Sequence, residues 1–172
     1  MPSKRILTII SILILFYNSP YCQTRFGVDI GFATIKSSLF GVKYFNDKNA
    51  FMLGFTYEFN DTKGKYVTEQ LWNYGKTIDS TGEYLISIDF GYSREILDNF
   101  YLNSEISAAW KNYYTNYIDN RFDGGGYHMI EVSDVFLGYG LSLGLYITDH
   151  FGMFFGYNTI RRTTIGFEFK SN

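Results

Sequence analysis

The amino-acid sequence predicts an all-β protein, an eight-stranded antiparallel up-and-down transmembrane β-barrel that follows an N-terminal signal peptide. Three observations lead to this fold class. Large apolar side chains recur at every second position, which is the period of a β-strand. Short polar turns alternate with long polar connections along the chain. Glycines occupy the strand face opposite the large side chains.

The first 22 residues have the three-part layout of a secretory signal peptide. Lys4 and Arg5 form the basic start, and an apolar run of 11 residues covers positions 6–16. This run is too short for a membrane-spanning helix, which needs roughly 20 residues. We therefore expect residues 1–22 to be removed and residues 23–172 to form one barrel domain. An acylated lipoprotein cysteine at Cys22 is the alternative, and the bulky Tyr21 before it argues against that.

The composition excludes several classes of function. Without Lys4 and Arg5 the chain has 13 basic and 17 acidic side chains, so a nucleic-acid partner is not expected. Cys22 is the only cysteine, which rules out an internal disulfide or a thiolate zinc site. No cofactor, metal site or catalytic residue is expected.

The recurrence of large side chains at every second position, interrupted by turn residues, predicts eight strands. In chain order they cover residues 25–34, 37–46, 50–60, 83–95, 99–113, 132–147, 150–158 and 162–170. The third strand shows the pattern most clearly, with Phe51, Leu53, Phe55, Tyr57 and Phe59. Tyr84 to Tyr92 repeat it in the fourth strand, and Leu137 to Leu145 repeat it in the sixth.

The connections between strands fall into two classes. Residues 46–49, 96–99 and 148–150 are short and contain Asn or Asp, which suit tight turns. Residues 61–82 and 115–131 are long, polar and contain glycine. Short turns at one end and long loops at the other are typical of outer-membrane barrels.

The glycines indicate which face points outward. Eleven of the 17 glycines share the strand face opposite the large side chains: Gly27, Gly31, Gly41, Gly54, Gly91, Gly138, Gly140, Gly144, Gly152, Gly156 and Gly166. The other six are assigned to loops. An eight-stranded barrel has little interior volume, so we expect small residues inside and large ones against lipid. A large-cored soluble β-sandwich is the alternative.

Two further sets of residues follow from this orientation. Aromatic side chains near the strand ends are expected to form interfacial girdles: Tyr44, Tyr57, Phe59, Tyr84, Tyr92, Trp110, Phe151, Tyr157 and Phe169. Charged side chains on the inward face are expected to form a polar network: Asp29, Lys43, Glu58, Asp89, Glu105, Lys111 and Glu168. Buried charges need partners, so we predict a lumen plugged by ion pairs and trapped water without a wide pore.

The whole mature chain resembles the small OmpA/OmpX-like outer-membrane β-barrel families. The resemblance rests on the signal peptide, the eight alternating strands and the closing strand at residues 164–169. The Gln expected to open the mature chain is similar to Bacteroidota-type members. The resemblance implies an outer-membrane location of the Gram-negative type and a C-terminal strand read by the barrel-assembly machinery. Phe167 and Phe169 match that aromatic pattern, although residues 170–172 follow them.

Two motifs could carry enzymatic chemistry. Residues 140–144 match G-x-S-x-G, but they lie in a predicted strand without the strand-to-helix turn that this motif needs. Some eight-stranded barrels modify the acyl chains of lipid A with a histidine near the outer leaflet. Here only His128, with Ser133 or Asp134, could form such a site. A solvated loop histidine is the simpler interpretation.

We therefore expect a monomeric integral outer-membrane protein with a structural or surface-interaction role, surrounded by outer-membrane lipid. The tyrosine-rich residues 66–74 and 113–117 either bind an extracellular ligand through loops 61–82 and 115–131 or extend the strands. The alternatives are an outer-membrane lipid-modifying hydrolase and a soluble lipocalin-like barrel that binds a small apolar ligand.

Overall fold

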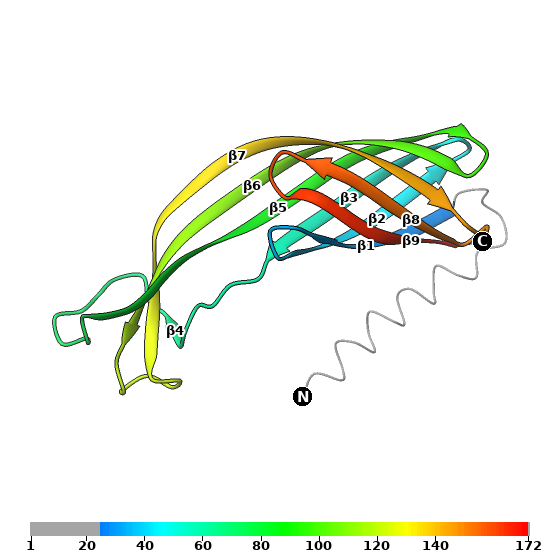
Figure 1. Cartoon of the computed structure of the whole chain (residues 1–172). Helices are drawn as coiled ribbons and strands as arrows, with labels where there is room; N and C mark the ends of the chain where they lie inside the picture. The colour runs from blue at the N-terminus through cyan, green and yellow to red at the C-terminus, as the bar shows by residue number, and fades with distance from the viewer. Residues whose placement is uncertain (1–24, 172) are drawn as a thin grey trace.

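The computed structural model describes residues 25–171, which form a closed ring of eight strands (Figure 1). The predicted signal peptide lies outside the described residues. The ring strands are β1 Arg25–Ala33, β2 Ser37–Asn46, β3 Asn49–Glu58, β5 Thr77–Leu97, β6 Phe100–Ile118, β7 Gly126–Tyr146, β8 Phe151–Asn158 and β9 Arg162–Lys170. A two-residue strand, β4 Lys65–Tyr66, lies outside the ring.

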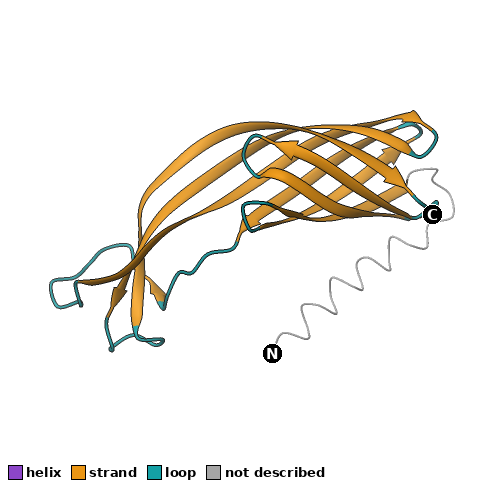
Figure 2. Cartoon of the chain, in the orientation of Figure 1, coloured by secondary structure: helices purple, strands orange, loops and turns teal. Residues whose placement is uncertain are grey.

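Each strand of the ring pairs antiparallel with its neighbour in the chain, and β9 closes the ring against β1. The closing pairs run from Gly27 opposite Lys170 to Ala33 opposite Thr164. Within the described range the elements are strands, turns and loops (Figure 2), and no helix is long and apolar enough to span a membrane. The predicted all-β, eight-stranded up-and-down ring is confirmed.

The turns explain how neighbouring strands reverse direction. Asp47 and Asn99 have φ angles of 53° and 65° in the β2–β3 and β5–β6 turns. Asp and Asn tolerate this left-handed conformation better than most residues. These two turns and the β7–β8 turn lie at one end of the barrel, which we call the short-turn end.

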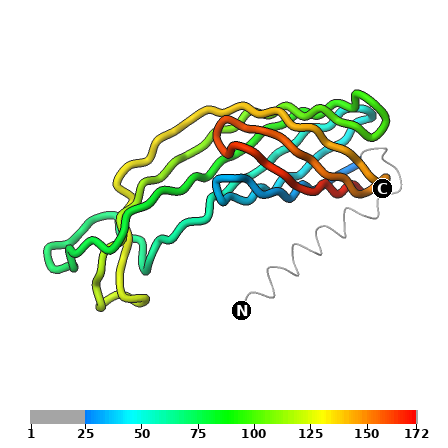
Figure 3. The backbone as a smooth tube through the Cα atoms, viewed as in Figure 1, coloured from blue at the N-terminus to red at the C-terminus, as the bar shows by residue number. Residues whose placement is uncertain are grey.

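At the other end β5, β6 and β7 continue beyond the ring as a three-stranded sheet (Figure 3). We call this the projecting sheet. β4 pairs parallel with the edge of β7, Lys65 opposite Tyr127 and Tyr66 opposite His128. Residues 77–82, 115–118 and 126–131 are therefore strand, which corrects their assignment to loops. Their polar sequence lacks a period-two apolar pattern because no uniform apolar surroundings face either side of this sheet.

The barrel wall has two different faces. Every strand of the ring exposes large apolar side chains on its outer face, for example Ile30, Phe40, Leu53, Phe90, Ile106, Leu141, Phe155 and Phe167. Ten of the eleven glycines assigned to the inner face are buried, and Gly91 is partly buried. Gly82 and Gly126 lie in β5 and β7, so their assignment to loops was wrong.

The inner face is not uniformly small, as the glycine pattern had suggested. Phe45, Tyr101 and Tyr146 form a buried aromatic cluster at the short-turn end. Glycine makes room for such rings. A Cβ added to Gly27 would lie 2.8 Å from the Phe45 ring, and one added to Gly166 would lie 2.5 Å from the Phe154 ring. Inward rings and inward glycines therefore fill the narrow interior together.

Candidate functional site

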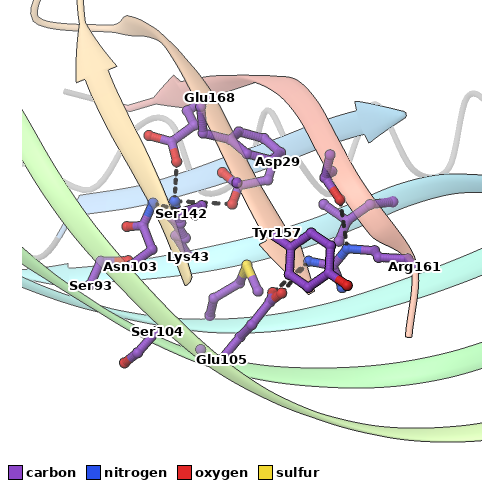
Figure 4. Close-up of a pocket in the computed structure, with 16 residues that line it drawn as sticks. Asp29, Lys43, Ser93, Asn103, Ser104, Glu105, Ser142, Tyr157, Arg161 and Glu168 are labelled. Carbon is purple, nitrogen blue, oxygen red and sulfur yellow. Dashed lines mark hydrogen bonds and ion pairs between the residues drawn. The ribbon is translucent and has the colours of Figure 1, made fainter. Parts of the chain in front are cut away.

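Lys43 of β2 lies between two carboxylates in the middle of the lumen (Figure 4). Its Nζ is 3.1 Å from Oδ2 of Asp29 on β1 and donates a hydrogen bond to Oε1 of Glu168 on β9. Asp29 and Glu168 are opposite each other in the β1–β9 register. All three side chains are at most 3% exposed, so the ion pairs are shielded from bulk solvent.

A second cluster surrounds Arg161, which lies in the turn between β8 and β9. Its guanidinium donates to both oxygens of Glu105, and Nη1 lies 3.2 Å from Oδ1 of Asp89. Thr56 and Ser87 donate their hydroxyls to Asp89. The Asp89 carboxylate is thus held by two neutral donors and one cation.

The two clusters leave little free space between them. The cavity between them, lined by Asp29, Lys43, Asn103, Glu105 and Glu168, has a volume of about 20 Å³. That is about the space that one water molecule occupies in a protein cavity. This cavity is therefore too small to hold a hydrated ion.

Five of the seven predicted lumen residues lie in the buried clusters, and the other two lie elsewhere. Asp29, Lys43, Asp89, Glu105 and Glu168 lie in the two buried clusters described above. Lys111 instead pairs with Glu83 at 2.7 Å near the base of the projecting sheet, where Lys111 is partly exposed and Glu83 is exposed. Glu58 is also partly exposed, at the end of β3.

Arg161 was missed by the sequence analysis, because a turn residue has no place in the alternation of strand faces. A signal for it existed. The charges assigned to the inner face comprised five carboxylates and only two cations, Lys43 and Lys111, and buried charges are costly without partners. A further cation was therefore needed, and Arg161 beside the last strand supplies it.

The aromatic residues assigned to the girdles lie on the outer wall. Tyr44, Phe59, Tyr92, Trp110, Tyr157 and Phe169 are exposed, and Tyr57, Tyr84 and Phe151 are partly exposed. Rings contact one another at both ends of the barrel. Tyr57 is 6.2 Å from Phe59 between ring centroids, and Phe151 is 5.4 Å from Phe169. Aromatic pairs of this kind contribute stabilisation beyond that of the apolar area that they bury.

The segment after β3 binds across one face of the projecting sheet. The backbone N–H of Asp61 donates to the Tyr114 hydroxyl, and that of Lys63 donates to the Asn116 side chain. Asn116 in turn donates to the Asp61 carbonyl and the Ser80 hydroxyl. Residues 59–67 therefore form an ordered strap that runs to β4.

The other side of the projecting sheet holds a small aromatic core around Tyr127, which is fully buried. Tyr117 stacks on it at 5.0 Å between centroids, and Tyr74 and Phe122 pack at 5.5 and 5.2 Å. The Tyr127 hydroxyl donates to the Gly75 carbonyl and accepts from Gln70. The loop after β4 is thereby fixed to the sheet.

Asp119 joins the two loops at the tip of the projecting sheet. Its carboxylate accepts hydrogen bonds from the Gly75 backbone N–H and from the Arg121 side chain and backbone. The hydrogen bonds from the Arg121 guanidinium, followed by the bond from Gly75, hold the pKa of Asp119 well below its usual range.

The tip carries an exposed apolar patch formed by Leu71 and Trp72. Trp72 is 89% exposed, so its ring contributes little to the packing of the tip. The tyrosine-rich residues were expected either to bind an extracellular ligand or to extend the strands. Residues 113–117 do extend a strand, because they lie in β6. The Leu71–Trp72 patch is an exposed apolar feature that sequence alone did not single out.

The candidate catalytic residues are not brought together. His128 Nδ1 bonds the Lys63 carbonyl and its ring packs on Tyr66, while the Ser133 hydroxyl donates to Asn112. Five positions along one strand separate His128 from Ser133, about 16 Å at the usual rise. Ser142 lies within β7 and accepts from Asn103, without the turn of a nucleophile elbow.

Comparisons with known proteins bear on the fold alone. No family model and no curated protein matches the chain. Among solved structures, the chain is similar to Neisserial surface protein A (10% identity, 85% of this chain and 93% of that chain covered, TM-score 0.47). It is also similar to Ail, the attachment invasion locus protein of Yersinia pestis (14% identity, 86% of this chain and 94% of that chain covered, TM-score 0.47). The N-terminal β-barrel domain of Pseudomonas aeruginosa OprF is a third example (13% identity, 86% of this chain and 96% of that chain covered, TM-score 0.41). Such identities and TM-scores are too low to transfer a function from any of these proteins.

Proposed function

We propose that the chain is an integral outer-membrane β-barrel with a closed lumen, and that its projecting sheet is a surface for interaction with an extracellular partner. The observation that carries the membrane assignment is the distribution of side chains across the wall. Large apolar groups cover the outside of the ring, and ion pairs fill the inside. A soluble barrel would have the opposite distribution.

The outer wall matches hydrocarbon in its chemistry. Alternate positions from 51 to 59, 84 to 92, 137 to 145 and 151 to 157 carry no charged side chain. A water-soluble monomer rarely exposes a contiguous apolar patch of more than a few hundred Å². Strands of nine to ten residues tilted by about 40° span roughly 25 Å, the height of the apolar band in outer-membrane barrels.

The same distribution argues against the lipocalin-like alternative. A barrel of that kind holds its apolar ligand in an enclosed apolar cavity, whereas the lumen here is filled by the Lys43 and Arg161 clusters. The hydrolase alternative lacks an assembled site, because His128 and Ser133 are bonded to other groups.

Fractionation tests the membrane assignment. We expect the full chain to sediment with the outer membrane, to need detergent for extraction, and to migrate differently on a gel before and after heating. Recovery of folded protein in the soluble fraction would contradict the assignment. In planar bilayers the closed lumen should give no stable, large conductance.

The interaction role needs a separate test that leaves the barrel intact. Trp72→Ser removes an exposed ring from the tip, and Leu97→Ser removes an exposed apolar side chain from the short-turn end as a matched control. Cells that display each variant are tested for retention on immobilised matrix proteins and glycans. We expect Trp72→Ser alone to reduce retention, and equal retention of all three proteins would remove the tip from the proposal.

A further inference from the structure

Phe45, Tyr101 and Tyr146 form three sides of a box at the short-turn end of the lumen. They come from β2, β6 and β7, and their ring planes meet at 69° to 85° with centroids 5.4 to 6.4 Å apart. All three rings are nearly fully buried. We call this group the aromatic cage.

The cage holds an ammonium group. Nζ of Lys170 on β9 lies 4.8 Å from the centroid of Phe45, 5.1 Å from that of Tyr146 and 5.9 Å from that of Tyr101. A cation within about 6 Å of a ring centroid is attracted by the negative face of the ring. Lys170 takes part in none of the ion pairs among the described residues. The rings are thus its close partners.

The cage opens into a cavity at the short-turn end. This cavity has a volume of about 560 Å³ and is lined by polar and charged side chains beside the rings. Asp47, Glu95 and Asp149 supply three carboxylates, while Arg25 and Lys170 supply two cations. With Lys170 withdrawn, the lining would be negative overall and would attract cations toward the rings.

We propose that the aromatic cage is a binding site for a small alkylammonium ion that enters from the short-turn end, and that Lys170 is a built-in competitor for this site. Cages of aromatic rings recognise alkylated ammonium groups because the methyl groups contact the rings while the charge faces their negative faces. Lys170 shows that the spacing of these three rings accepts an ammonium nitrogen. The proposal does not depend on the function proposed for the projecting sheet.

The competition sets the size of the expected effect. If Lys170 occupies the cage in about 90% of molecules, an external ligand finds only about one tenth of the sites open. Its apparent dissociation constant is then raised about tenfold. Removal of the lysine side chain should restore the intrinsic affinity, although no new contact to the ligand is formed.

The test uses the full chain refolded in detergent micelles, with tetramethylammonium chloride as the probe. Binding is followed by calorimetry for the wild type, Lys170→Ala and Lys48→Ala, which removes an exposed lysine from a turn at the same end. We expect Lys170→Ala to bind about tenfold more tightly than the other two. Neopentyl alcohol, a neutral molecule of similar shape, should not bind to it.

Two further measurements make the result specific. The double variant Lys170→Ala/Tyr101→Leu should lose the binding gained by Lys170→Ala, because one aromatic face is replaced by an aliphatic side chain. In the wild type, the ε-methylene protons of Lys170 should show a ring-current shift that decreases as tetramethylammonium is added. This second readout still decides the matter if Lys170→Ala does not fold, as judged by its mobility on unheated gels.

Three outcomes would overturn the proposal. One is equal affinity of Lys170→Ala and the wild type for tetramethylammonium. Another is equal binding of neopentyl alcohol, which would make the cage an apolar cavity only. The third is a Lys170 resonance that stays unchanged throughout the wild-type titration.

Discussion

Arg161 and Glu105 form an ion pair inside the barrel, in which one nitrogen, Nη2, lies 2.7 and 2.5 Å from the two carboxylate oxygens. The arginine comes from the β8–β9 turn and the carboxylate from β6, 56 positions apart in the chain. Because the guanidinium also contacts Asp89, one turn residue pairs with two carboxylates of the wall. The β8–β9 turn is thereby tied to the opposite side of the ring.

Arg161→Met should therefore be strongly destabilising. The change leaves Glu105 and Asp89 buried without their cation, and breaking a buried pair in this way costs about 3–5 kcal/mol. The free energy of unfolding, measured in urea with the protein in micelles, gives the effect. Arg162→Gln is the control, because this neighbour is exposed and should change stability by about 0.5 kcal/mol or less. Similar losses in both variants would contradict a special role for Arg161.

In the Lys43 cluster, removing all three charges together should destabilise the protein less than removing the lysine charge alone. Lys43→Met alone leaves Asp29 and Glu168 facing each other as unpaired charges, and should cost several kcal/mol. The triple change Lys43→Met/Asp29→Asn/Glu168→Gln removes all three charges together. It should be more stable than the single variant, because neutral groups are less costly to bury. Urea unfolding of both proteins provides the comparison, and a triple variant less stable than the single one would be inconsistent with the ion-pair account.

The strands of the ring could be predicted closely from sequence, because their two faces meet different surroundings. β2 and β9 were predicted with the ends that the structure shows, and β1 and β8 within one residue. Each of these strands alternates between the apolar wall and the lumen, so the period of two is unbroken. Glycine and large side chains together also indicated which face is inside.

The projecting sheet and the lumen chemistry could be predicted only in part. Residues 115–118 and 126–131 mix polar, aromatic and aliphatic side chains without a period of two, so no alternation marked them as strand. The alternation places Phe45, Tyr101 and Tyr146 on the inner face of their strands. The small interior of an eight-stranded barrel nevertheless suggested that only small residues would lie there. The space for these rings comes from glycines on neighbouring strands, such as Gly27 beside Phe45, and this depends on the register of pairing.

Gly64 offers a test of how the strap is held on the projecting sheet. Its φ angle is +56°, and a Cβ added there would lie 1.9 Å from the Gly126 carbonyl oxygen. Gly64→Ala should therefore displace the strap while the barrel stays folded. Limited proteolysis should show faster cleavage within residues 59–76, and the heat-modifiable gel shift should remain.

Gly125→Ala is the matched control for Gly64→Ala. Gly125 also has a positive φ, +78°, but an added Cβ would meet nothing within 4 Å. This variant carries only the backbone strain of a non-glycine residue in that region, of order 1–2 kcal/mol. We expect much less cleavage of the strap than in Gly64→Ala, and equal cleavage would mean that strain rather than steric contact explains the effect.

Asp119 should make the tip of the projecting sheet sensitive to acid. Its pKa is lowered in the folded protein by the bonds from Arg121 and Gly75, so the ionised form is favoured there relative to the unfolded tip. The resulting stabilisation is fully present above the unfolded pKa of about 3.9 and is lost as the pH falls through the lower folded pKa. The tip should therefore loosen below about pH 4, while neutral and mildly acidic conditions leave it unchanged.

Amide hydrogen exchange checks this acid dependence, once rates are corrected for the intrinsic effect of pH. The Gly75 N–H donates to the Asp119 carboxylate and the Gly125 N–H donates to the Phe122 carbonyl, so both report on the tip. Their protection should fall in acid in the wild type. In Asp119→Asn the protection should be lower at neutral pH and should no longer change near pH 4. Wild-type protection that is constant down to about pH 3 would show that another interaction fixes the two loops.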